Sequence, residues 1–195
     1  MVALRKRQPT QMTVEEFLEW DADDMTGRRW QLIDGEPVMM APAADVHGSI
    51  QIELARLLGN HLLAVGSHCR VVGAPGIVPR VRANINFRVP DIGVTCVPQS
   101  GTVMMPEPVL LIEILSPGNE ATTRSNIWTY TTIPSVQEIL SVRSDRIEAE
   151  VLRRDAARNW PLEPLTIRPP GNLELTSIGF VCQIASPYRT AGLAE

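Results

Sequence analysis

Two carboxylates set in apolar stretches are the residues of this chain best suited to chemistry. Asp91 follows Pro90 and opens the strand-like run 91–97, and Glu113 lies inside the aliphatic run 109–115. A short apolar run that ends at a turn is typical of a strand buried on both faces. An ionised Glu there costs roughly several kcal/mol unless a cation, a metal or hydrogen-bond donors compensate it.

Carboxylates at the ends of neighbouring strands form a hard-oxygen site of the kind that Mg²⁺ or Mn²⁺ prefers. We therefore expect Asp91 and Glu113 to hold a divalent metal. Two simpler interpretations stay open from these residues alone. Glu113 is then one half of a structural ion pair with an arginine, and Asp91 is a residue that merely starts a strand. The combination of the two acids favours the metal site.

The elements that must position these acids can be outlined from local signals. Thr13 and Glu16 fit a capping box that begins a short helix, to about Trp20. Asp34-Gly35 predicts a hairpin between two apolar runs. A longer helix is expected over residues 46–64, because its apolar residues recur at helical spacing. These residues are Ile50, Leu54, Leu57, Leu58 and Leu62.

His47 shares this apolar stripe in the first turn of the longer helix. One interpretation is a histidine satisfied by a nearby carbonyl or carboxylate. The other places His47 on the rim of the acidic site, where its partners would set its tautomer.

The alternation in residues 83–89 predicts a strand. Ile85, Phe87 and Val89 would share one face and Asn84, Asn86 and Arg88 the other. Residues 98–108 carry prolines and a glycine and predict an exposed loop.

A further helix is expected after the Glu113 strand. Thr122 or Thr123 would cap it and Pro134 would end it, with Trp128 and Tyr130 as packing residues. A hairpin around Ser144-Asp145 and short strands near residues 165, 173–175 and 180–182 complete a mixed α/β sheet.

Length and composition predict one soluble domain. The chain has 195 residues, which we divide into a flexible arm over residues 1–12 and a single domain over residues 13–190. The net charge of −4 argues against bulk coating of nucleic acid. All but one of the 18 basic residues are arginine, so lysine is almost absent as a base.

The cysteines and the apolar runs bear on the compartment. Cys69, Cys96 and Cys182 lack the spacing of a zinc site and predict reduced thiols. No run reaches transmembrane length and no secretory signal opens the chain. We expect a cytoplasmic protein with no membrane contact.

The motifs, taken in order, resemble the Uma-two family, often labelled putative restriction endonuclease, within the PD-(D/E)XK nucleases. The resemblance covers roughly residues 10–155. It implies a restriction-endonuclease-like fold, a mixed sheet flanked by helices with extra β-hairpins, and also a homodimer, DNA as substrate and Mg²⁺ or Mn²⁺ as cofactor. The motifs that carry it are Trp30-Gln31-Leu32-Ile33-Asp34-Gly35-Glu36, His47, Val89-Pro90-Asp91, Ile112-Glu113-Ile114-Leu115-Ser116-Pro117 and the helix Thr123-Arg124-Ser125-Asn126-Ile127-Trp128-Thr129-Tyr130.

The resemblance assigns metal binding to Asp91, Glu113 and Ile114. Leu115 stands where the superfamily usually has lysine, and the family is expected to carry that lysine on the next helix, at Asn126. Gln31 replaces the acid of the family's hairpin motif. Gln31 removes one negative charge, so we expect weaker metal binding, whereas Asn126 can donate a hydrogen bond but brings no positive charge.

Arg124 is considered as a source of the missing positive charge. It does not share a helical face with Asn126, although it could reach a phosphate from the helix N-terminus.

Two functions follow from different classes of protein. The first is a metal-dependent endonuclease whose catalytic residues are Asp91, Glu113, Asn126, Gln31 and His47. The second is a degenerate nuclease fold that binds nucleic acid or protein without catalysis, which the missing lysine and the acidic pI favour. A purely structural homo-oligomer has support only from the family's expected dimerisation.

Overall fold

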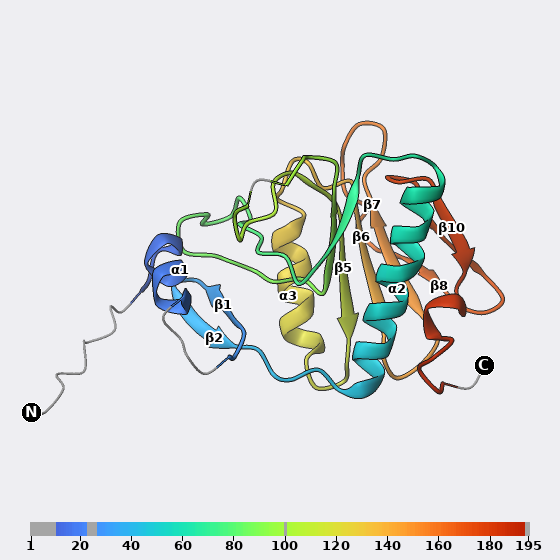
Figure 1. Ribbon diagram of the computed structural model, residues 1–195, viewed down its shortest axis with the longest axis horizontal. Helices are drawn as coiled ribbons and strands as arrows, with labels where there is room; N and C mark the ends of the chain where they lie inside the picture. The colour runs from blue at the N-terminus through green and yellow to red at the C-terminus, as the bar shows by residue number, and fades with distance from the viewer. Residues whose placement is uncertain (1–10, 23–26, 100, 194–195) are drawn as a thin grey trace, which may run out of the picture.

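A six-stranded mixed sheet forms the centre of the protein, as the computed structural model shows for residues 11–22, 27–99 and 101–193 (Figure 1). Its strand order is β3-β4-β5-β6-β7-β8, and β5 and β6 are parallel while the other neighbours are antiparallel. The predicted mixed α/β fold is confirmed. The strands are β3 (Arg70–Gly73), β4 (Ile92–Thr95), β5 (Pro108–Leu115), β6 (Glu138–Arg143), β7 (Ala149–Arg153) and β8 (Leu165–Ile167).

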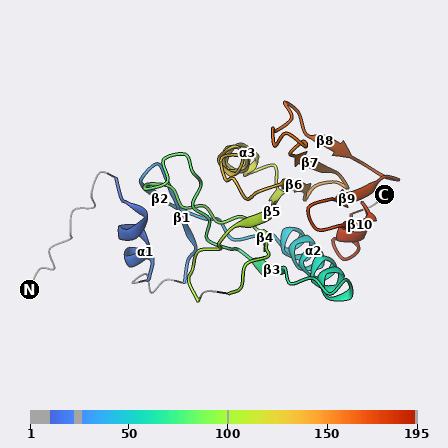
Figure 2. The ribbon, with the colours of Figure 1, turned by 90° about the horizontal axis from the view of Figure 1, so that it is seen from above.

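Two helices cover opposite faces of the sheet, α2 (Asp45–Ala64) and α3 (Glu120–Tyr130) (Figure 2). The side chains of β5 point alternately into the two hydrophobic cores that these helices form with the sheet. Leu110, Ile112 and Ile114 pack with the apolar stripe of α2, and Leu111 packs with Ile127 and Tyr130 of α3. Glu113 has the parity of Leu111 and therefore faces α3.

Smaller elements lie beyond both ends of the central sheet, and their strands form two separate two-stranded sheets (Figure 1). On one side lie α1 (Val14–Ala22) and the hairpin of β1 (Trp30–Ile33) and β2 (Glu36–Met39). On the other, β9 (Asn172–Leu175), β10 (Phe180–Gln183) and the 3₁₀ helix η1 (Ser186–Tyr188) pack against the α2 core. The hairpin predicted at Asp34-Gly35 and the later short strands are confirmed.

The capping box at the start of α1 is also confirmed. The Thr13 N–H donates to Glu16 Oε2 over 2.8 Å, and the Glu16 N–H donates to Thr13 Oγ1 over 3.2 Å. Most of the predicted N-terminal arm, residues 1–10, lies outside the described residues. Met12 is buried and donates its N–H to the Gly35 carbonyl over 2.7 Å.

The predicted strand at residues 83–89 is wrong. Residues 81–84 form a turn, and only Phe87 and Arg88 make isolated β-bridges. Asn86 and Arg88, expected on the face opposite Phe87, are 1% and 3% exposed, as buried as Phe87 itself. Asn86 can be buried because its side chain forms hydrogen bonds with Asp34. A prediction from hydrophobic alternation fails here, because it assumes that polar residues stay in solvent.

Details around α3 also differ from prediction. The helix begins at Glu120 with Asn119 at its N-cap, not at a threonine, because Ser116-Pro117 lets the chain turn at once. Trp128 was expected to pack in the core but is 61% exposed, whereas Tyr130 is fully buried. The predicted exposed loop 98–108 contributes a buried residue, Met105, to the α3 core.

The cysteine prediction is wrong for one pair. Cys69 and Cys96 form a disulfide, and Cys182 is a free thiol. Arg70 pairs with Thr95 across β3 and β4, so the flanking Cys69 and Cys96 come to lie opposite each other. This pairing follows from the strand register, which spacing along the chain does not show. Within the described ranges, none of the helices combines the length and apolar character needed to span a membrane.

Candidate active site

Asp91 is held by residues from two different elements. Its Oδ1 lies 2.9 Å from Nε2 of His47 in the first turn of α2, and its Oδ2 accepts the Ile114 N–H over 2.7 Å. Gln51, one turn further along α2, donates to the Asp91 backbone carbonyl over 2.7 Å. Asp91 therefore joins the start of α2 to the Glu113 strand. Its hydrogen bond with His47 fits both predicted placements of the histidine, one satisfied by a nearby carboxylate and one beside the acidic pair.

Glu113 projects from β5 into the interface with α3. Its Oε1 accepts the Tyr130 hydroxyl over 2.7 Å, and the residue is 5% exposed. Burial raises the pKa of Glu113 well above its ordinary value, and the nearby Asp91 charge raises it further. The Tyr130 hydroxyl and the Asn126 amide act in the opposite direction and lower this pKa.

Glu113 bonds to Tyr130 and forms no ion pair with an arginine in the described portion of the chain. The alternative that Glu113 is one half of a structural Glu–Arg pair is therefore wrong. Tyr130 is the partner that sequence reasoning missed, because it was assigned to packing. A signal was present: Tyr130 follows Asn126 by one helical turn, so the two residues share the face of α3 that meets β5.

Gln31 and Asn126 lie in the same buried region, at 5% and 7% exposure. Asn126 Nδ2 donates to Gln31 Oε1 over 3.4 Å, which links β1 to α3. The Asn126 Oδ1 is buried and has no hydrogen-bond partner. The predicted site residues are thus brought together: hydrogen bonds link His47, Asp91 and Ile114, Glu113 lies beside Asp91 and Asn126, and Gln31 contacts Asn126.

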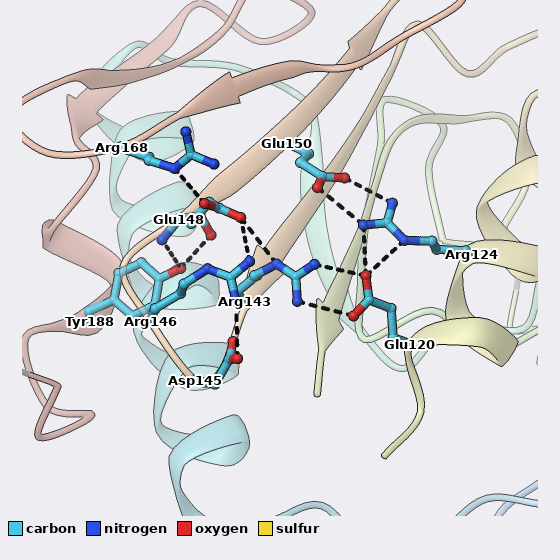
Figure 3. Close-up of polar contacts among 9 residues, drawn as sticks. All are labelled: Glu120, Arg124, Arg143, Asp145, Arg146, Glu148, Glu150, Arg168 and Tyr188. Atoms are coloured by element: carbon cyan, nitrogen blue, oxygen red, sulfur yellow. Dashed lines mark hydrogen bonds and ion pairs between the residues drawn. The ribbon is translucent and has the colours of Figure 1, made fainter. Parts of the chain in front are cut away.

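Arg124 does not supply the missing positive charge as considered from the sequence. Its guanidinium makes paired hydrogen bonds to Glu150 over 3.0 and 3.1 Å and contacts Glu120 over 2.9 Å (Figure 3). Two carboxylates therefore neutralise this arginine.

Arg88 is a buried cation that was predicted on a polar strand face. It donates to the Leu32 carbonyl over 2.9 Å, and its Nε has no partner. Burial raises the pKa of the Tyr130 hydroxyl well above its ordinary value, and the Arg88 charge acts in the opposite direction.

The oxygen atoms of this region fit a hard divalent cation. Asp91 and Glu113 offer carboxylates, and the unpartnered Oδ1 of Asn126 is an amide oxygen in the same buried region. Each Asp91 oxygen accepts one hydrogen bond and keeps further lone-pair capacity. Ile114 could contribute only its backbone carbonyl.

Comparison with known proteins places the chain in a family. Residues 14–184 match the family model of the Uma2 putative restriction endonucleases. The chain belongs to this family. A relative of the Uma2 chain, an uncharacterized protein of Synechocystis sp., is 29% identical over 186 residues. The alignment covers 94% of this chain and 93% of the relative.

A solved structure shares the fold. It is the crystal structure of a putative nuclease belonging to DUF820 from Anabaena variabilis, with a TM-score of 0.71 and 18% identity. The alignment covers 91% of this Uma2 chain and 97% of that protein. At this identity the likeness establishes the fold, a nuclease-like mixed sheet flanked by helices.

Proposed function

We propose that this Uma2 protein is a metal-dependent endonuclease that hydrolyses phosphodiester bonds in DNA, with Asp91 and Glu113 as ligands of Mg²⁺ or Mn²⁺. One observation carries the proposal. Glu113 is buried beside a second carboxylate, and no described cationic side chain pairs with it. A bound cation would supply the counter-charge that this arrangement lacks.

Each of these residues has a separate role in the proposed site. Asp91, Glu113 and the Ile114 carbonyl would hold the metal. A bound divalent ion polarises the phosphate and lowers the pKa of water. His47 fixes the orientation of the Asp91 carboxylate through its 2.9 Å hydrogen bond, and Tyr130 fixes Glu113 through its 2.7 Å hydrogen bond. In the hydrolysis, the oxygen of water bonds to phosphorus, a phosphorus–oxygen ester bond breaks, and the leaving oxygen takes up a proton.

A second function is favoured by the neutral pair of Gln31 and Asn126. Two amides at these positions bring no charge to a phosphate, so a scaffold that binds nucleic acid or protein without catalysis fits them. The homodimer and the cytoplasmic location expected from the sequence stay predictions.

The deciding experiment is calorimetric titration of MnCl₂ and MgCl₂ into the wild type and Asp91→Ala, together with a plasmid-nicking assay. Glu113→Gln is a second variant, and the matched control is Glu163→Gln, which changes an exposed carboxylate in the turn before β8. We expect the two site variants to lose at least about tenfold in metal affinity and to lose nicking. The control should behave as wild type.

The absence of metal binding by the wild type at millimolar concentrations would contradict the endonuclease. DNA binding measured against salt concentration would then distinguish a nucleic-acid module from a protein-binding one, because only phosphate contacts give a steep salt dependence.

A further inference from the structure

The two positions at which this chain departs from the family pattern touch each other. Gln31 and Asn126 are 95 residues apart in the chain, yet Asn126 Nδ2 donates to Gln31 Oε1. Both side chains are buried. The two departures are therefore one structural unit, a neutral amide pair between β1 and α3.

This contact fixes how the Asn126 amide is turned. Its nitrogen is directed to Gln31 and lies beside the Glu113 carboxyl group, whose pKa it lowers. Its oxygen is left buried with no partner. An unpartnered buried acceptor destabilises the fold, so a ligand that bonds to this oxygen would remove that penalty.

The surroundings favour a cation as that ligand. Asp91 and Glu113 bring two carboxyl groups to the same region, and no described cation pairs with Glu113. Neutral carbonyl oxygens combine with carboxylates in sites for hard divalent ions. A lysine side chain has no acceptor atom and could not act in this way.

We propose that Asn126 contributes Oδ1 as a neutral ligand of the divalent cation held by Asp91 and Glu113, and that Gln31 is a positioning residue that keeps this oxygen turned into the site. The inference rests on the proposed metal-dependent function. It gives position 126 a role opposite in kind to that of the expected lysine: the side chain binds the cation and does not carry a positive charge itself.

The test is calorimetric titration of MnCl₂ into Asn126→Leu, with Tyr130→Phe as the matched control. Both changes remove a hydrogen-bond donor from Glu113, but only the first removes the free carbonyl oxygen. We expect both variants to lose Mn²⁺ affinity and Asn126→Leu to lose at least about tenfold more than Tyr130→Phe, because only Asn126→Leu also removes a ligand atom. The near-isosteric Asn126→Asp adds charge to the ligand and should bind Mn²⁺ about tenfold more tightly.

Gln31→Leu tests the positioning role. It should lower the Mn²⁺ affinity of the wild type but leave that of Asn126→Leu unchanged, because the residue acts through the Asn126 amide. If Gln31→Leu lowers the affinity equally in both backgrounds, Gln31 is not a positioning residue for Asn126.

The outcomes separate this inference from the proposed function. If Asn126→Leu binds Mn²⁺ like the wild type, or loses no more than Tyr130→Phe, Asn126 is not a ligand, while an Asp91→Ala variant that loses binding would still uphold the metal-dependent enzyme. If Asn126→Leu fails to fold, Asn126→Asp decides alone, and an unchanged or weaker affinity overturns the inference. A wild type that binds no Mn²⁺ overturns both.

Discussion

Glu113 and Asp91 differ in their surroundings although they lie close together. The Asp91 carboxylate lies 2.9 Å from the His47 ring nitrogen and accepts the Ile114 N–H. Glu113 is buried, and burial outweighs the donors that Tyr130 and Asn126 supply, so its pKa is raised. Asp91 is thus held by polar partners from two elements, whereas Glu113 binds its proton more tightly than an exposed glutamate does.

This enclosure predicts a pH dependence of stability. The pKa of Glu113 is raised in the folded state above about 4.3, the value of an unfolded Glu, so the folded protein holds the proton more tightly. The stabilisation is complete below about pH 4 and is lost as pH rises through the raised pKa. Glu113→Gln cannot lose a proton, so its free energy of unfolding relative to wild type should increase from pH 5 to pH 8 in urea titrations.

The comparison needs a carboxylate that is not buried. Glu163→Gln, which changes an exposed carboxylate before β8, is the matched variant measured over the same pH range. A difference between Glu113→Gln and wild type that stays constant from pH 5 to pH 8 would contradict the raised pKa of Glu113.

A network of arginines and carboxylates joins α3 to the β6–β7 hairpin and to the segments around Arg168 and Tyr188 (Figure 3). Glu148 directly precedes β7. Its carboxylate accepts hydrogen bonds from Arg143 over 3.1 Å, from Arg146 over 2.8 Å and from Arg168, which follows β8. Its backbone also bonds the hydroxyl of Tyr188 in η1. One carboxylate therefore ties the β6–β7 hairpin to the edge strand and to the C-terminal segment.

Glu148→Gln should destabilise the fold by about 3 kcal/mol at pH 7, because it leaves three arginines facing a neutral amide. Hydrogen bonds from Arg146 and Arg168 lower the pKa of Glu148 to about 2. A lowered pKa means that the wild-type stabilisation is present above about pH 4.5 and is lost as pH falls towards 2. Urea titrations at pH 7 and pH 3 should show the two proteins converging in acid.

Glu150→Gln provides the comparison for this network. Glu150 pairs with Arg124, whose side chain is 43% exposed, so solvent screens the pair and the expected loss is under about 1 kcal/mol. If both variants lose the same free energy of unfolding, the buried Glu148 contacts stabilise the fold no more than the exposed Glu150–Arg124 pair does.

At the scale of the whole molecule, the sheet presents its two acids between α2 and α3. His47 of α2 forms a hydrogen bond with Asp91, and Tyr130 of α3 donates one to Glu113. β4 is a short strand whose place depends on its neighbours, β5 and β3. The Cys69–Cys96 disulfide fastens β4 to the edge strand β3 at the end remote from Asp91.

Replacing both Cys69 and Cys96 by serine should lower the free energy of unfolding by about 3–4 kcal/mol, because the disulfide joins residues 27 positions apart and restricts the unfolded chain. Urea unfolding under oxidising conditions measures the loss. Cys182→Ser, which removes the free thiol, should cost far less. A wild type whose stability does not change on adding dithiothreitol would contradict the contribution of the disulfide.

Much of the architecture follows from local patterns. The aliphatic run around Glu113, the stripe of α2 and the Asp34-Gly35 turn each gave the correct element, because burial on a strand or helix repeats with a fixed period along the chain. The same rule failed at residues 83–89, where Asn86 and Arg88 are buried with hydrogen-bond partners from distant residues. Polar burial has no period, so it cannot be read from alternation.

The sequence by itself determined that Asp91 directly precedes one apolar strand segment and that Glu113 lies inside another, since apolar runs are local properties of the chain. Only the tertiary structure decided what each acid meets. The parity of β5 turns Glu113 to Tyr130, the packing of β1 on α3 joins Gln31 to Asn126, and the register of β3 with β4 joins the two cysteines. These contacts connect residues far apart in the chain, and their geometry exists only once the elements have packed together.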